Sequence, residues 1–267
     1  MTTRLTILGC GSAVPTLQNN PSSQVLDMCD KLFLIDCGEG TQNTMRQLGV
    51  HTNRLYSILI SHLHGDHCFG IIGLLSTLGM LGRTQDMHIY AHKDLDTLLR
   101  PLINYFCPRL TFSVIFHHIN PRRSELIFDD RTLTIKTIPL RHTVPTCGFL
   151  FEEKPRRRHI ETGAKPFSYA YCSDTGYKPA ITRWLNDVDV LYHEATYLED
   201  QRASADRYQH CTAAQAAKIA NKIHAHKLII GHFSARVIDQ SAFLYEAQTL
   251  FPDTILAEER KTYEFNS

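Results

Sequence analysis

The stretch that most constrains this chain is "ILISHLHGDHCFG", residues 58–70, in which a short apolar run is followed at once by polar side chains. His62, His64, Asp66 and His67 fall within six positions. A fold that buried so many polar groups without a metal would leave several of them without a hydrogen-bond partner. Imidazole nitrogens and carboxylate oxygens are ligands for zinc and similar divalent ions. The stretch therefore predicts a metal site at the end of a buried strand.

Three other apolar runs also end in a metal-capable side chain. His142 follows "LTIKTIPLR", Asp174 follows "YAYCS" and His232 follows "KLIIG". Functional side chains of layered α/β folds gather at strand ends, so we expect all seven residues to face one cleft. One tetrahedral ion cannot use seven ligands. Two ions ~3.5–4 Å apart could, and a water shared between them would ionise near neutral pH. Zinc is favoured, although manganese or iron also fits mixed histidine and carboxylate ligands.

The rest of the chain reads as strands with helices spaced between them, which indicates a layered α/β architecture. Helices are expected near 69–82, 94–105, 212–223 and 239–250. Strands are expected at 4–9, 23–28, 31–38, 57–62, 86–92, 110–119, 131–142, 147–154, 167–174, 187–196 and 226–233.

Composition limits the partners and the compartment. The net charge of +1 neither demands nor excludes a nucleic acid, so RNA binding would need a local basic patch. The eight cysteines are scattered without a C-x-x-C pair, which is typical of reduced thiols in a cytoplasmic protein. The most apolar segment, 68–82, is too short and glycine-rich to span a bilayer, so no membrane association is expected.

The segment "EEKPRRRHIETGAKP", residues 152–166, differs from its surroundings. It is charged, contains two prolines and a glycine, and lacks apolar periodicity, so we expect an exposed loop or arm. Its basic run, Lys154 with Arg156, Arg157 and Arg158, could contact phosphates. A solvated loop without function is the alternative.

Several further motifs carry a family resemblance. The strings "LGCGSAVPT" (8–16), "LIDCGEGTQ" (34–42), "SHLHGDHCFGIIGLLST" (61–77), "AYCSDT" (170–175), "HEATY" (193–197), "HCTAAQAA" (210–217) and "LIIGHFSAR" (228–236) resemble the ribonuclease Z family of the metallo-β-lactamase superfamily. The resemblance implies an α/β fold, a four-layer αβ/βα sandwich, with residues 1–267 forming a single domain. It also implies a zinc-dependent endonuclease that removes the 3′ trailer from precursor tRNA and works as a homodimer.

The resemblance assigns roles to the residues. His62, His64 and His142 would bind one zinc ion, and Asp66, His67 and His232 the other, with Asp174 as the bridge between the two ions of each subunit. Asp66 would orient the metal hydroxide that attacks phosphorus. His210, supported by Glu194, would protonate the departing 3′ oxygen.

Two departures from the family pattern leave alternatives open. Typical members carry a long tRNA-gripping arm, but here the interval is only 152–166. The loop "PTLQNN" (15–20) has Leu17 and Asn19 where many bacterial members have basic residues linked to sensing the CCA end. A phosphodiesterase acting on small or cyclic nucleotides is therefore the second hypothesis. A non-enzymatic RNA-binding protein with a relic metal site is the third, and seven filled ligand positions argue against it.

Overall fold

Near-continuous apolar runs such as "KLFLI" and "KLIIG" become interior strands of two seven-stranded sheets, as expected for strands covered on both faces. The computed structural model describes residues 2–237 and 239–266, and at Arg158 and Thr162 the backbone alone. These residues group into two units. The N-terminal unit comprises Thr2–Ile119 with Glu259–Phe265, and the C-terminal unit comprises Asn120–Glu258.

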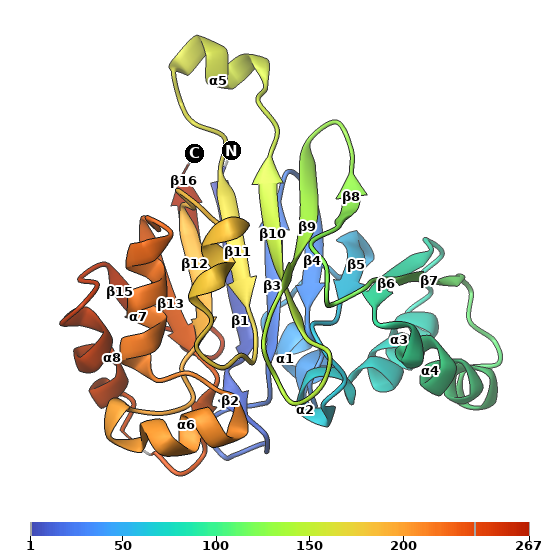
Figure 1. Ribbon diagram of the computed structural model, residues 1–267. Coiled ribbons are helices and arrows are strands. Elements are labelled where there is room, and N and C mark those ends of the chain that lie inside the picture. The colour runs from blue at the N-terminus through green and yellow to red at the C-terminus, as the bar shows by residue number, and fades with distance from the viewer. Residues whose placement is uncertain (1, 238, 267) are drawn as a thin grey trace. The chain divides into compact units, whose positions relative to one another are not determined.

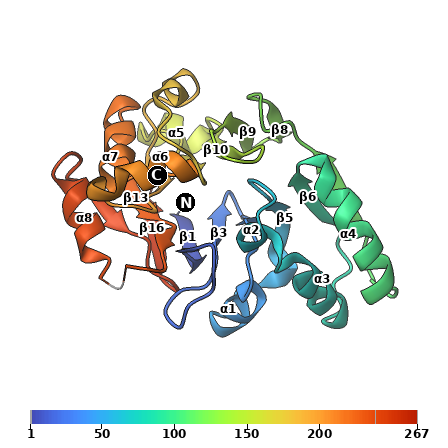
Figure 2. The same ribbon diagram turned by 60° about the horizontal axis from the view of Figure 1, so that its bottom comes forward.

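The sheet of the N-terminal unit is antiparallel at one edge and parallel at the other. Its strands follow the order β16 (Thr262–Asn266), β1 (Thr2–Gly9), β3 (Ser23–Met28), β4 (Lys31–Ile35), β5 (Leu55–Leu59), β6 (Met87–Ala91) and β7 (Val114–His118). The helices of this unit are α1 (Thr41–Gln47), α2 (Gly65–Cys68), α3 (Ile71–Met80) and α4 (Lys93–Phe106), and a short strand β2 (Gly11–Ser12) follows β1. Helices α3 and α4 lie side by side (Figure 2) and contribute buried leucines to the core.

The sheet of the C-terminal unit combines the same two kinds of pairing. Its strands follow the order β15 (Thr254–Leu256), β13 (Lys227–Gly231), β12 (Val190–Glu194), β11 (Ser168–Cys172), β10 (Cys147–Glu153), β9 (Leu133–Pro139) and β8 (Leu126–Asp129). The first four strands are parallel and the last four antiparallel. The helices are α5 (Arg157–Thr162), α6 (Arg202–Tyr208), α7 (Ala213–Lys222) and α8 (Ser241–Gln248), and β14 (Phe233–Ser234) follows β13.

Helix α7 begins and packs as its sequence predicts. The Thr212 side chain accepts a hydrogen bond from the Gln215 backbone, and the Gln215 side chain accepts one in return from the Thr212 backbone. Ala213, Ala216 and Ala220 are fully buried. Small side chains allow α7 to approach the sheet closely, and it lies along β12 and β13 (Figure 1).

Most expected elements are present, and a few differ. The strand expected at 110–119 is shorter, because only Val114–His118 pairs in the sheet. Several elements were not predicted, among them α1, α6, β8, β15 and β16. The expectation of a loop across 152–166 is wrong in part, because β10 extends to Glu153 and α5 occupies Arg157–Thr162. Local interactions explain this helix. Arg157 forms an i,i+4 ion pair with Glu161, and Gly163 ends the helix in a left-handed conformation.

Within residues 2–237 and 239–266, no helix combines the length and apolar character needed to cross a bilayer.

Candidate metal centre

The N-terminal unit brings four of the predicted ligands together after β5. His62 lies just beyond the strand, His64 is the N-cap of α2, and Asp66 and His67 lie in that helix. His62 Nε2 lies 3.1 Å from His64 Nδ1, and His67 Nε2 lies 3.5 Å from Asp66 Oδ2. The His62 and His67 rings have centroids 4.1 Å apart. These distances place four ligand-type side chains in one small volume.

A buried carboxylate that the sequence analysis missed, Asp36, supports this cluster. It follows β4 and accepts hydrogen bonds from the Ser61 backbone N–H, Ser61 Oγ and His67 Nδ1, each at 2.8 Å. Since Ser61 Oγ donates to Asp36, it can accept from His62 Nδ1 at 3.0 Å. Both imidazoles therefore use Nδ1 for the scaffold and direct Nε2 elsewhere, as metal-binding histidines commonly do.

The signal for Asp36 was present in the sequence. The apolar run 31–35 also ends in an aspartate, and it pairs with β5, the strand that precedes His62. Asp66 is oriented independently of Asp36, because the Ala13 backbone N–H donates to its Oδ2 at 2.8 Å. Two backbone segments thus fix two carboxylates of this cluster.

The C-terminal unit assembles the remaining predicted ligands around Asp174. Its Oδ1 lies 3.2 Å from His232 Nε2, and its Oδ2 lies 3.7 Å from His142 Nε2. His142 Nδ1 donates to the Gln209 carbonyl at 3.0 Å, and His232 Nδ1 contacts Thr196 Oγ1 at 2.9 Å. The same arrangement appears again, with Nδ1 anchored to the scaffold and Nε2 turned toward the carboxylate.

Glu194 and His210, the predicted proton-transfer pair, are in direct contact. His210 Nδ1 donates to Glu194 Oε1 at 2.9 Å. The same carboxylate accepts from the backbone N–H groups of Thr175, Cys211 and Thr196, each at 3.0 Å, and from Thr196 Oγ1 at 2.9 Å. Burial acts to raise the pKa of Glu194, but the facing His210 lowers it, and the net pKa lies below its ordinary value. Glu194 is therefore held as a carboxylate behind His210.

Thr196 is a second supporting residue that the sequence analysis missed. Its hydroxyl donates to Glu194 and lies 2.9 Å from His232 Nδ1 and 3.2 Å from His210 Nδ1. It therefore connects a predicted ligand with the predicted proton donor. His210 also lies close enough to act as a ligand itself, since ligand atoms of Asp174, His210 and His232 all lie within 4.8 Å of one another. Geometry alone allows either role for His210.

Three of the four predicted RNA-binding cations are already paired. Lys154 forms an ion pair with Asp129, Arg156 Nη2 lies 3.4 Å from Glu153 Oε1, and Arg157 Nε lies 2.7 Å from Glu161 Oε1. The Arg158 side chain lies outside the described residues. The segment itself, with α5, projects past the ends of β10 and β11 (Figure 1).

Comparisons with known proteins identify the family. Residues 31–233 match the model of the beta-lactamase superfamily domain. The chain is 46% identical to ribonuclease Z of Bacteroides fragilis, with 96% of each chain covered. It is 47% identical to ribonuclease Z of Azobacteroides pseudotrichonymphae over 95% of this chain and 96% of the relative. The chain belongs to the ribonuclease Z family. The human tRNase Z short-form structure superposes on it with a TM-score of 0.81, at 27% identity, covering 97% of this chain and 98% of the human one.

Membership of the ribonuclease Z family confirms several of the predictions made from the sequence. The fold is that of the metallo-β-lactamase superfamily, with two sheets flanked by helices, and the chain is an enzyme that hydrolyses phosphodiester bonds. Family membership and the clustered histidines and aspartates also support metal binding. The Bacteroides fragilis alignment runs over 293 residues, more than the 267 of this chain, so that ribonuclease Z contains residues without a counterpart here.

Proposed function

We propose that this ribonuclease Z family member removes the 3′ trailer from precursor tRNA at a site containing two zinc ions. The observation that carries the metal part is the shared anchoring of the histidines. Nδ1 of His62, His67, His142 and His232 contacts a Ser, Asp, carbonyl or Thr oxygen, with Nε2 left as the ligand atom. Such second contacts fix the ring orientation and strengthen a metal ligand.

The proposed ligand sets follow the family resemblance. His62, His64 and His142 would hold one ion, Asp66, His67 and His232 would hold the other, and Asp174 would be shared by both. Five imidazoles and two carboxylates are a donor set that suits zinc. When bound, the two ions supply Lewis acidity that activates water and neutralises charge on the phosphoryl group. The family model spans parts of both units, which supports one functional domain over residues 1–267.

The chain's own groups carry the proton transfers. Asp66, with one oxygen held by the Ala13 backbone, orients the attacking water and accepts its proton. His210 gives a proton from Nε2 to the departing 3′ oxygen. The ionised Glu194 contacts Nδ1 of the same ring and stabilises the protonated imidazole until the transfer occurs. The products are a tRNA with a 3′ hydroxyl and a trailer with a 5′ phosphate.

The short arm changes how the RNA is held. Lys154, Arg156 and Arg157 could exchange their carboxylate partners for phosphates, but breaking an ion pair offsets much of each gain. We therefore propose that the basic run, Arg158 included, contributes weak and salt-dependent contacts to precursor tRNA.

A homodimer and a cytoplasmic location complete the proposal. Helices α3 and α4 carry exposed apolar side chains, among them Met80 at 85%, Tyr105 at 79% and Phe106 at 62% exposure. Large exposed apolar side chains that cluster on neighbouring helices mark association surfaces. The reduced state of the eight cysteines, all free thiols in the structure, agrees with a cytoplasmic location.

The test is cleavage of a 3′-extended precursor tRNA by the zinc-loaded protein, with the new 3′ end mapped by sequencing. A cut just after the discriminator base is expected. Bis(p-nitrophenyl) phosphate, a small diester, is assayed in parallel. Turnover of the small diester alone, with no inhibition by added tRNA, would instead support the phosphodiesterase for small or cyclic nucleotides.

A further inference from the structure

A pocket of about 250 Å³ opens in the C-terminal unit beside the loop that carries His142. Its cationic lining residues are Arg122 and Arg141, the proposed ligand His142 also lines it, and none of the described residues that line it is acidic. Prolines, aliphatic side chains and two threonines form the remaining wall. The pocket thus combines positive charge with a partly apolar surface next to a proposed metal ligand.

Arg141 is held in place by the loop that carries Asp174. Its backbone N–H donates to Thr175 Oγ1 at 3.1 Å, and its carbonyl accepts from the Gly176 N–H at 2.7 Å. A Cβ atom at Gly176 would lie 2.5 Å from Arg141 Nη2, so the guanidinium packs directly over this glycine. The arginine is therefore positioned before any ligand arrives, which lowers the entropy cost of binding.

The second arginine and a nearby lysine extend the positive charge. The Arg122 backbone N–H donates to Asn120 Oδ1 at 3.0 Å, which fixes the turn that presents its side chain. Lys178 Nζ donates to the Pro139 carbonyl at 2.8 Å. Burial and then the neighbouring charge of Arg141 lower the pKa of Lys178, as expected where cations lie close together.

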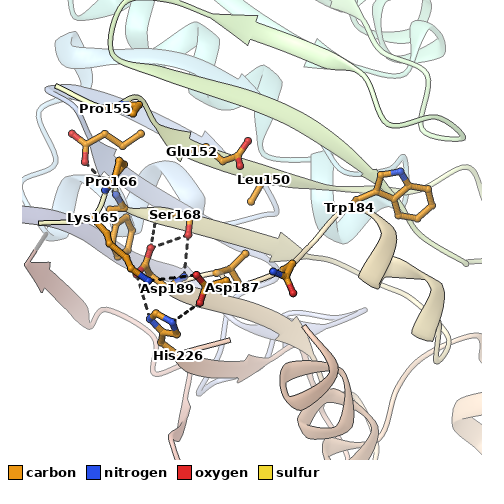
Figure 3. Close-up of a pocket in the computed structure, with 14 residues that line it drawn as sticks. Leu150, Glu152, Pro155, Lys165, Pro166, Ser168, Trp184, Asp187, Asp189 and His226 are labelled. Carbon is orange, nitrogen blue, oxygen red and sulfur yellow. Dashed lines mark hydrogen bonds and ion pairs between the residues drawn. The ribbon is translucent and has the colours of Figure 1, made fainter. Parts of the chain in front are cut away.

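The charges of this pocket differ from those of a larger one at the other end of β10. That pocket, of about 400 Å³, contains Lys165, Asp187 and His226, and their ion pairs link them to one another (Figure 3). By contrast, neither Arg122 nor Arg141 forms an ion pair with any carboxylate in the part of the chain that the structure describes. Two arginines without a neutralising partner are available to an anion.

We propose that the pocket between Arg122 and Arg141 binds a phosphate of the RNA strand next to the phosphate that is cleaved. The inference rests on the proposed function, because it takes the site beside His142 as the point of cleavage. Guanidinium groups pair with phosphate oxygens through two parallel hydrogen bonds, and the aliphatic wall can contact the attached ribose. A flanking phosphate bound here would fix the position of the RNA strand and so compensate for the weak RNA contacts of the basic segment 152–166.

The test compares Arg122→Ala/Arg141→Ala with Arg4→Ala/Arg100→Ala, which removes the same amount of charge from arginines paired with Glu264 and Asp96. The KM for precursor tRNA should rise roughly tenfold in the pocket variant and stay near wild type in the control. The salt dependence of binding to a single-stranded RNA should become shallower by about 0.7 in log–log slope, because the contact with one phosphate is lost. Equal KM values and equal slopes in the two variants would overturn the proposal.

Two further measurements separate this proposal from the alternatives. Gly176→Ala keeps both charges but displaces the Arg141 guanidinium, so its KM should also rise, and a wild-type KM would count against the pocket. The Arg122→Ala/Arg141→Ala variant must lose more activity on precursor tRNA than on bis(p-nitrophenyl) phosphate, which has no flanking phosphate. Equal losses on both would mean that His142 itself is disturbed, contradicting a binding role. If the wild-type protein does not cut precursor tRNA, the proposed function is wrong. The salt dependence of binding to single-stranded RNA still tests whether the pocket binds a phosphate.

Discussion

Polar side chains differ sharply in burial between two regions of the molecule. One region is the set of strand ends that carry the predicted ligands, and the other is the basic segment within residues 152–166. At the strand ends, His67 and Asp36 are fully buried and hydrogen-bonded to each other, and Glu194 accepts from five donors. In the segment, Arg157 is largely exposed and pairs only with a helix neighbour. Buried polar networks are costly to disturb, whereas exposed ion pairs contribute little. The side chains proposed for catalysis are therefore fixed by buried hydrogen bonds, whereas the basic segment makes only a minor contribution.

The largest effect on zinc binding is expected at Asp36, which is not one of the proposed metal ligands. Asp36→Ala removes the acceptor for His67 Nδ1 and Ser61, so the proposed ligand His67 loses its orientation. Zinc affinity or activity should fall by about 10- to 100-fold. Zinc content by mass spectrometry and the cleavage rate check this. Asp27→Ala, at a surface carboxylate paired with Arg54, is the control. Wild-type zinc content and rate in Asp36→Ala would show that the buried carboxylate has no such role.

The largest effect on the cleavage rate is expected at His210, and it separates proton transfer from metal binding. His210→Ala should slow cleavage by about 10²- to 10⁴-fold while the zinc content stays at the wild-type level, because the ring is proposed to move a proton and not to bind zinc. Glu194→Gln should also lower the cleavage rate, since a neutral amide cannot stabilise the imidazolium of His210. If His210→Ala loses zinc instead, the residue is a ligand, as its distance from Asp174 and His232 would allow.

A smaller effect is expected from the basic segment. Lys154→Ala/Arg156→Ala/Arg157→Ala should raise the KM for precursor tRNA by only about two- to threefold, because each cation already has a carboxylate partner. Steady-state kinetics at low and physiological salt provide the measurement. A rise of tenfold or more would reverse the comparison and make the segment a principal tRNA contact.

The smallest effect is on thermal stability and concerns His88 and His117, whose rings contact each other directly. His117 Nε2 lies 2.9 Å from His88 Nδ1, and burial followed by the charges of His88 and His118 lowers the pKa of His117. Folding then favours the neutral ring, so its contribution to stability is present above the unfolded pKa of about 6.5 and is lost as pH falls below it. Between pH 7.5 and 5.5, Tm should fall more for wild type than for His117→Gln. Parallel Tm curves would contradict this.

The position of the proposed ligands at strand ends could be predicted from the sequence, because a short-range rule determines it. His62, His142, Asp174 and His232 each follow an apolar strand that could be recognised from its own residues. Glu194, at the end of β12, follows the same rule.

The supporting residues were harder to predict. Asp36 acts through His67, 31 positions away, and Thr196 acts through His232, 36 positions away, so their roles depend on pairing between distant strands. Helix α5 was missed for a different reason. Its local contacts are an i,i+4 ion pair, a hydrogen bond from the Arg156 backbone N–H to His159 Nδ1 and a left-handed glycine, and none of these shows as apolar periodicity. Arg141 gave no signal at all, since its placement depends on the absence of a side chain at Gly176.

The most direct test of the proposed metal centre is a crystal structure of the zinc-loaded protein, with the ions located by anomalous scattering. We expect two zinc ions bridged by Asp174, with His62, His67, His142 and His232 coordinating through Nε2 and with His210 outside both coordination shells. A single ion held by Asp174, His210 and His232 would contradict it, because the proton donor would then be a ligand and the anchored rings near Asp36 would have no metal to bind.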